Sequence, residues 1–363
     1  MSLNDLNLSV ARFQMRTSAG TRIRLYRQLE RLLRNGVRLT EALDSLWRRA
    51  SNEGRKPTDS VALALAAWKQ GPASGRGLAA AMAPWIPNEE RLLIEAGEQA
   101  GQLAQALSDV VDLAQGTKRI RNTIVSGLAY PVALFAALLM TLWYLSDSIV
   151  PAFATILPPE QWTGTGAWLA TLAWFAERYT LVIAFGSLGL VLLYLATVAR
   201  WTGRTRLFVE GLPPWSFYRL SQGIGFLLAS SALLRAGMQM TEVFDRLRQD
   251  SSPYLRERLT AAVQRIRSGD NFGNALYKTG MEFPDKDIVQ DLRTYAGLTG
   301  FNDTLAQIAR EWLEEAVRKV QGQAQALNMA MLFLMFVLIV VVFTGLYEVT
   351  SQIGEASQPA GIL

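Results

Sequence analysis

An acidic side chain set between glycines is the most distinctive chemical pattern in this sequence. Glu98 lies in the run Gly97-Glu98-Gln99-Ala100-Gly101. Gly97 and Gly101 permit a tight connection between two helices. A carboxylate in such a connection could cap the helix that follows it, or could meet a basic residue of a partner protein. Both are binding roles rather than catalysis.

The sequence lacks the residue types that most enzyme mechanisms need. It has no cysteine and no histidine. This excludes disulfides, zinc sites built from Cys or His, and nucleophile pairs that depend on an imidazole base. No Gly-x-x-x-x-Gly-Lys-Ser/Thr run for nucleotide phosphates occurs either. We therefore predict a non-enzymatic protein with no cofactor and no metal.

Part of the chain around the Glu98 region is predicted to lie in a membrane. Half of the 363 residues are apolar and only 18% are charged, and the mean hydropathy is +0.15. Three stretches without Asp, Glu, Lys or Arg are long enough to cross a bilayer as helices. They are residues 124–146, 179–199 and 327–347.

The basic residues predict the orientation of these spans, because Lys and Arg gather at the cytoplasmic ends of membrane helices. Of 36 basic residues, 18 precede the first span, 17 lie between the second and third, and one lies between the first and second. We predict a multi-pass membrane protein with a cytoplasmic amino terminus and a carboxyl terminus on the outer side of the membrane. Acidic residues are mixed into both basic blocks, so no nucleic-acid partner is predicted.

The two basic blocks are copies of one helical unit. LLRNGVRLTEAL at 32–43 and LLRAGMQMTEVF at 233–244 share Leu-Leu-Arg, a glycine and Thr-Glu at a constant offset of 201. SGRGLAAAM at 74–82 likewise matches SGDNFGNAL at 268–276. Apolar residues recur at spacings of three and four, so each copy is predicted to be a bundle of about six short helices.

Glycines mark the predicted turns within each copy. Gly36 and Gly237 follow helical runs and can take the left-handed conformation that ends a helix. Thr40, like Thr241 in the second copy, would then cap the next helix. Two further turn glycines, Gly297 and Gly300, stand where the second copy corresponds loosely to the Glu98 region.

The resulting prediction is an all-α protein with two repeated cytoplasmic bundles and three transmembrane helices. An apolar stretch in the external loop is predicted as an interfacial helix, with Trp162, Trp168 and Trp174 in an aromatic belt. The predicted segments are an amino-terminal segment 1–20, bundle 21–123, span 124–146, loop 147–178, span 179–199, bundle 200–326, span 327–347 and tail 348–363.

From about Arg24 to Tyr347 the sequence resembles the platform proteins of type II secretion systems and type IV pilus assembly machines. The Gly-Glu-x-x-Gly-x-Leu motif of that family matches residues 97–103, and Ala129-Tyr130-Pro131 opens the first span as in the family. The second Gly-Glu motif is degenerate, since Leu298 replaces the glutamate, and Asn328-Met329 replaces a Glu-Pro pair. These departures favour the type IVb pilus branch.

The resemblance implies a platform in the inner membrane beneath a growing filament, with a cytoplasmic amino terminus and a periplasmic carboxyl terminus. It implies that the protein couples a cytoplasmic hexameric ATPase to insertion of pilin or pseudopilin subunits, within a homo-oligomer that also contacts other inner-membrane assembly proteins and the lipid bilayer. Two alternatives from other classes are a small-molecule permease and a membrane signalling scaffold. No ionisable residue lies within a predicted span, which disfavours an ion path or a transport site.

Two further groups of residues are candidates for function. Tyr130 and Pro131 could form a hinge in the first span, or a static kink. Six arginines recur every three or four residues and could meet an acidic partner or anionic lipid, or form a solvated face. They are Arg22, Arg24, Arg27, Arg31, Arg34 and Arg38.

Overall fold

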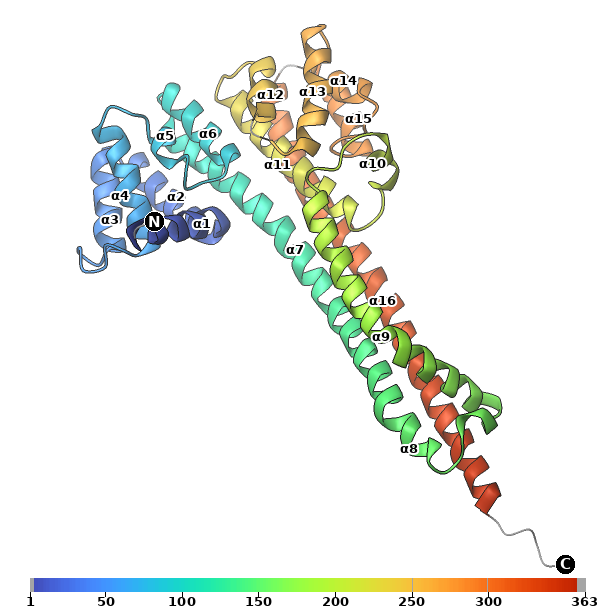
Figure 1. Ribbon diagram of the computed structural model, residues 1–363. Helices are drawn as coiled ribbons and strands as arrows, with labels where there is room; N and C mark the ends of the chain where they lie inside the picture. The colour runs from blue at the N-terminus through green and yellow to red at the C-terminus, as the bar shows by residue number, and fades with distance from the viewer. Residues whose placement is uncertain (1–2, 250, 299, 358–363) are drawn as a thin grey trace, which may run out of the picture. The chain divides into compact units, whose positions relative to one another are not determined.

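The computed structural model describes residues 3–249, 251–298 and 300–357, and each regular element in these ranges is a helix (Figure 1). The predicted all-α class is confirmed. The chain forms two compact units. The bundle unit combines the described residues up to 122 with residues 198–318, and the membrane unit combines residues 123–197 with the described residues from 319 onward.

The bundle unit contains the same run of helices twice, and in both copies the last helix is far longer than the others. In the first copy they are α2 (Ala19–Arg34), α3 (Leu39–Ala50), α4 (Ser60–Ala73), α5 (Leu78–Met82), α6 (Asn88–Gln99) and α7 (Leu103–Tyr144). In the second copy they are α11 (Trp215–Arg235), α12 (Met240–Gln249), α13 (Pro253–Arg267), α14 (Phe272–Lys278), α15 (Lys286–Tyr295) and α16 (Phe301–Ser357).

The duplication extends to side-chain contacts. In both copies the second and third helices of the copy pack together as a hairpin, α3 with α4 and α12 with α13 (Figure 1). Asp44 on α3 pairs with Lys69 on α4. Asp245, at the same offset of 201, pairs with Arg267 on α13 at 2.7 Å. An ion pair across the same hairpin in both copies indicates that they arose from one unit.

The connection between the first two helices of each copy depends on a left-handed glycine. Gly36 has φ +81° and Gly237 has φ +88°, a conformation that a residue with a Cβ adopts only at a cost. The expected threonine caps are wrong, because α3 begins at Leu39 after Arg38, and α12 begins at Met240. Each helix begins before its threonine, whose hydroxyl therefore lies inside the first turn.

Each copy buries its own aromatic core. In the first copy Tyr26 stacks on Trp68 with ring centroids 6.5 Å apart, and both side chains are buried. In the second copy four buried phenylalanines pack with centroids 5.1 to 5.9 Å apart. They are Phe226, Phe244, Phe272 and Phe283. Aromatic pairs of this kind stabilise a core beyond their buried area.

Two short helices precede the copies. α1 (Leu3–Thr17) packs against α4 and buries Ala11 and Met15, so this part of the predicted amino-terminal segment belongs to the first bundle. α10 (Arg204–Val209) precedes the second copy.

The membrane unit contains three helices that are long and apolar enough to cross a membrane, and the prediction of three spans is confirmed. They are the later part of α7, α9 (Gly164–Thr197) and the later part of α16. Short helical segments connect α7 to α9: a π-helix η1 (Leu145–Ile149), α8 (Val150–Ala154) and a 3-10 turn η2 (Pro159–Gln161).

The stretch predicted as an interfacial helix forms the first part of α9 and continues into the second span. Leu169 there is fully buried and lies close to Gly345 of α16. Trp168 and Trp174 are exposed, whereas Trp162 is buried and donates from Nε1 to the Leu157 carbonyl oxygen at 3.0 Å. The Trp162 indole N–H thus has its acceptor inside the unit, and the aromatic belt stays a prediction.

Candidate interface between the two bundles

Ion pairs join the two copies inside the bundle unit. Arg246 on α12 lies 3.0 Å from Glu95 on α6, and Arg235 at the end of α11 lies 2.9 Å from Asp109 on α7. Asp109 is buried, whereas both partners of the Arg246–Glu95 pair are partly exposed, so the latter pair stabilises the contact by no more than about 1 kcal/mol. Together these pairs contribute more to the register between the copies than to the strength of the contact.

The same contact continues along α7 and α16. Arg119 forms a two-pronged pair with Glu314, of which one bond is 2.8 Å long, and Arg310 lies 3.8 Å from Asp112. Between these pairs a Cβ at Gly116 would lie 2.6 Å from a methyl group of Leu228 on α11. Close approach of α7 to the second copy therefore requires a glycine at position 116.

The glycine-glutamate run lies beside this contact. A cleft of about 260 Å³ opens between the copies. Gly97 and Gln102 line one side, and Arg235 and Asp303 line the other. The motif that sequence analysis selected thus meets the second copy, although the ion pairs that hold the contact lie outside it.

The two glycines of the motif have different functions. Gly101 has φ +67° and makes the turn from α6 into α7. Gly97 is helical, and a Cβ there would lie 2.1 Å from that of Ala106. Gly97 therefore allows α6 and α7 to touch. In the second copy Gly300 has φ +80°, whereas Gly297 lies in a turn without a left-handed φ.

Glu98 caps a different helix from the one expected. Its carboxylate accepts from the backbone N–H groups of Leu78 and Ala79, the latter at 2.9 Å, and so caps the start of α5. The expectation that Glu98 caps the following helix is wrong. The N-cap residue of α5 is Gly77, which has no side chain of its own to accept these bonds.

The second copy caps the equivalent helix in another way. Asn271, which corresponds to Gly77 in the repeat alignment, is the N-cap residue of α14 and accepts from the Asn274 N–H at 2.9 Å. Leu298 stands where the motif has its glutamate and is exposed. The degenerate second motif has a physical explanation, since a self-capping asparagine removes the need for the glutamate.

This exchange predicts a rescue. Glu98→Ala should destabilise the first bundle by about 1 to 2 kcal/mol through loss of the cap. Gly77→Asn alone should be unfavourable, because its Cβ would lie 2.8 Å from a Glu98 carboxylate oxygen. Gly77→Asn with Glu98→Ala should recover most of the loss, since the φ and ψ of Gly77 (−60°, 157°) resemble those of Asn271 (−73°, 171°).

Hydrogen exchange of the α5 amides in the full-length protein measures this double-mutant cycle. Strictly additive changes in protection would contradict the exchange of one cap for the other. The matched control is Asn271→Ala, which should expose only the amides of α14.

The arginine face of α2 divides into inward and outward residues. Arg22 is buried, so the prediction that it lies on the exposed face is wrong. Arg27, Arg31 and Arg34 are exposed, and Arg34 pairs with Glu30 at 2.6 Å. Arg27 and Arg31 have no ionic partner within the described part of the chain. They present two unneutralised cations one turn apart.

Arg22 forms part of a buried polar triad. Its Nε and Nη2 atoms each donate to the Glu90 carboxylate at 2.9 Å, and the Tyr26 hydroxyl donates to the same carboxylate at 2.6 Å. Burial first, and then the charge of Glu90, raise the pKa of Tyr26 well above its ordinary value, so the phenol remains a donor. The triad fixes α2 to the start of α6.

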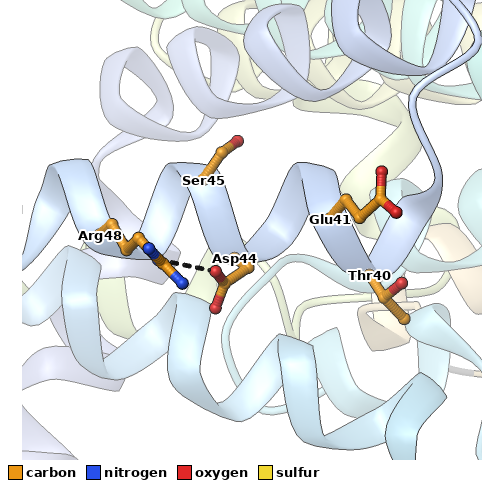
Figure 2. Close-up of a pocket in the computed structure, with 5 residues that line it drawn as sticks. All are labelled: Thr40, Glu41, Asp44, Ser45 and Arg48. Atoms are coloured by element: carbon orange, nitrogen blue, oxygen red, sulfur yellow. Dashed lines mark hydrogen bonds and ion pairs between the residues drawn. The ribbon is translucent and has the colours of Figure 1, made fainter.

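A shallow hollow lies along the outer side of α3, and Figure 2 shows its lining, Thr40, Glu41, Asp44, Ser45 and Arg48. Arg48 pairs with Asp44 at 2.8 Å, and a hydrogen bond from Lys69 is the main reason that the pKa of Asp44 is lowered. The acidic side chain is already neutralised by its neighbours. No group of three acidic side chains placed to hold a metal ion occurs within the described ranges.

The proposed hinge residues lie in the membrane unit. α7 is helical through Pro131, and Tyr130 is half exposed. Sequence analysis missed a second buried charge cluster, Arg206, Glu210 and Arg258, each at most 2% exposed. The sequence signal for this cluster is a glutamate four residues after an arginine.

A duplicated helical bundle joined to three apolar helices defines a multi-pass helical membrane protein. The profile of the family described as type II secretion system (T2SS), protein F, matches residues 25–151 and again residues 226–347. The two matches begin 201 residues apart and cover more than half of the chain. The chain belongs to this family, and the recognition from sequence is confirmed.

Two curated relatives carry names from pilus assembly. The toxin coregulated pilus biosynthesis protein E of Vibrio cholerae is 21% identical over 339 residues, which cover 92% of this chain and 97% of that protein. Type IV pilus assembly protein PilC of Thermus thermophilus is 25% identical over 267 residues, 70% of this chain and 64% of that protein. The family and both names support a role in a pilus or secretion system.

Proposed function

We propose that this protein is the non-enzymatic inner-membrane platform of a type IV pilus or type II secretion machine. Its amino terminus lies in the cytoplasm and its carboxyl terminus in the periplasm, as the two basic blocks indicate. The bundles engage a hexameric ATPase, and the membrane helices act on pilin or pseudopilin subunits. Family membership and the pilus-assembly names of both relatives support this proposal.

The observation that carries the coupling role is the continuity of two helices. α7 is helical from Leu103 to Tyr144, and α16 from Phe301 to Ser357. Each therefore serves both as the last helix of a bundle and as a membrane span. A hydrogen-bonded helix transmits a displacement along its axis far better than a flexible linker does. Work done on a bundle can reach the bilayer directly.

The exposed cations of α2 are the proposed contact with an acidic surface of the ATPase. Arg27 and Arg31 are exposed and unpaired within the described residues. Charge complementarity of this kind mainly raises the association rate and makes it sensitive to salt.

We expect the full-length protein, tagged at its amino end and extracted in mild detergent, to recover a hexameric ATPase from its own cells. The double variant Arg27→Glu, Arg31→Glu should lower that recovery by about tenfold, as expected for loss of two charge contacts. The matched control is Arg55→Glu, Lys56→Glu, which makes the same charge change in an exposed turn.

Equal recovery with both double variants would remove α2 from the contact. Absence of any ATPase from the wild-type eluate, together with normal surface filaments in a deletion strain, would contradict the platform itself.

A further inference from the structure

The short helix α10 and the turn that follows it bury two charged side chains and expose two large apolar ones. Arg206 and Glu210 are 0% and 1% exposed, whereas Phe208 is 91% exposed and Leu212 62%. A surface helix in water shows the opposite arrangement. An outward apolar face is stable when a nonpolar environment covers it.

Contacts on the inner side fix this orientation. Arg258 of α13 donates to the Glu210 carboxylate, and Arg206 lies 3.5 Å from the same group. The Gly203 N–H donates to the Glu257 carboxylate at 3.0 Å. The segment is thus bound to the second bundle by its polar side, and Phe208 and Leu212 point away as a consequence of the fold.

The chain places α10 next to a membrane span. α9 ends at Thr197 and α10 begins at Arg204, so six residues separate them. Fully extended, six residues reach only about 20 Å. The connection is also tied down, because the Tyr254 N–H donates to the Ala199 carbonyl oxygen at 3.1 Å. α10 therefore begins within about 20 Å of the end of α9, which is near the leaflet where this span ends.

The residues around Phe208 suit a lipid headgroup layer. Arg204 and Phe208 are four residues apart in α10 and share one face, and Leu212 is exposed in the turn after the helix. Arg204 is exposed and has no ionic partner in the described ranges. Trp201 and Trp215 flank the segment, with ring centroids 6.1 Å apart. Tryptophan is favoured at the interface, and arginine near a membrane surface attracts anionic lipids.

We infer that residues 200–215 form an interfacial anchor on the leaflet where the second span ends. Phe208 and Leu212 insert among the acyl chains, and Arg204 binds an anionic headgroup. The inference rests on α9 crossing the membrane and not on the filament machine. Residues 152–225 lie outside both stretches that match the family profile, so the inference does not draw on the family.

Spin labelling tests this anchor directly, because the sequence has no cysteine to remove. Phe208→Cys and Leu212→Cys are labelled with a nitroxide in the full-length protein and reconstituted into phosphatidylcholine vesicles with and without phosphatidylglycerol. Accessibility to oxygen, which concentrates in lipid, is compared with accessibility to a water-soluble nickel chelate. The matched control is Phe13→Cys, an exposed phenylalanine (69%) on α1, far along the chain from any span.

We expect the labels at 208 and 212 to favour oxygen over the nickel chelate, at a depth of about 5 to 10 Å below the headgroup boundary. The label at 13 should favour the nickel chelate. Phosphatidylglycerol should increase the depth at 208, and Arg204→Gln should abolish that increase.

Nickel accessibility at 208 equal to that at 13 would overturn the anchor, because it would show that Phe208 faces water in the reconstituted protein. Low accessibility to both reagents, with spin coupling that disappears on dilution with unlabelled protein, would show that a second copy covers the face, and would also overturn it. Equal depth in both kinds of vesicle would overturn the assignment of Arg204 to an anionic lipid.

Discussion

Replacement of Glu90 by alanine is expected to destabilise the first bundle by about 3 to 5 kcal/mol, because it leaves a buried arginine without its counter-ion. Arg22 and Glu90 are each 4% exposed. Two guanidinium donors and the Tyr26 hydroxyl all converge on the Glu90 carboxylate. No water can replace these bonds unless the bundle opens.

The loss should also loosen α1. Arg22 Nη1 donates to the carbonyl oxygens of Met15 and Arg16, at 2.6 Å each. These groups belong to the last turn of α1, which has no helical donors left. Because Glu90 holds the guanidinium in place, its removal weakens the contact of α1 with the bundle as well.

Hydrogen exchange of the full-length protein provides the measurement. Amides of α4 should lose protection by about a hundredfold or more, since each 1.4 kcal/mol corresponds to a factor of ten, while those of α13 serve as an internal reference. The control is Glu30→Ala, which breaks the more exposed pair with Arg34 and should cost less than about 1 kcal/mol. Comparable losses for the two variants would contradict the special position of Glu90.

The architecture was predictable because its signals are local or repeated. Stretches without charges define the three spans, and the constant offset of 201 reveals the duplication. Gly36 and Gly237 follow helical runs, and both have a left-handed φ. A turn of this kind depends on the backbone of a few consecutive residues, so the sequence of those residues suffices to locate it.

The polar contacts were not predictable, because their partners are distant along the chain. Glu98 lies in the last turn of α6, beside the predicted connection, but the α5 amides that it binds lie about 20 residues earlier. Glu90 has the position in a first turn that favours a carboxylate, yet its partner Arg22 is 68 residues away. Proximity of such pairs is a product of the tertiary fold.

One error could have been avoided from the sequence. Arg22 was assigned to the exposed arginine face, although positions 22, 26 and 29 follow the helical spacing that also buries Tyr26 and Leu29. A charged residue on an apolar stripe predicts a buried partner of opposite charge. Arg206 and Glu210 are buried in the same way, and each has a partner of opposite charge.

The second buried cluster predicts a large effect for substitution of Glu210 and a small effect for substitution of Arg206. Glu210→Ala should destabilise the second bundle by about 3 to 5 kcal/mol or more, since it is the carboxylate between two buried arginines. Arg206→Met should lie within about 1 kcal/mol of the parent. All three Arg206 guanidinium nitrogens are buried without a hydrogen-bond partner in the described structure, so little is lost when they are removed.

The contrast follows from charge balance. Arg258 lies 3.6 Å from the Tyr254 ring centroid, and Arg206 lies 5.1 Å from it, so one ring holds two cations. Glu210 offsets one of them, and methionine at 206 would remove the other while it fills similar space. Exchange of α13 amides, with α4 as the reference, measures both variants. A large loss from Arg206→Met would contradict this charge balance, and would mean that the Arg206 guanidinium stabilises the bundle through Glu210, which lies 3.5 Å away.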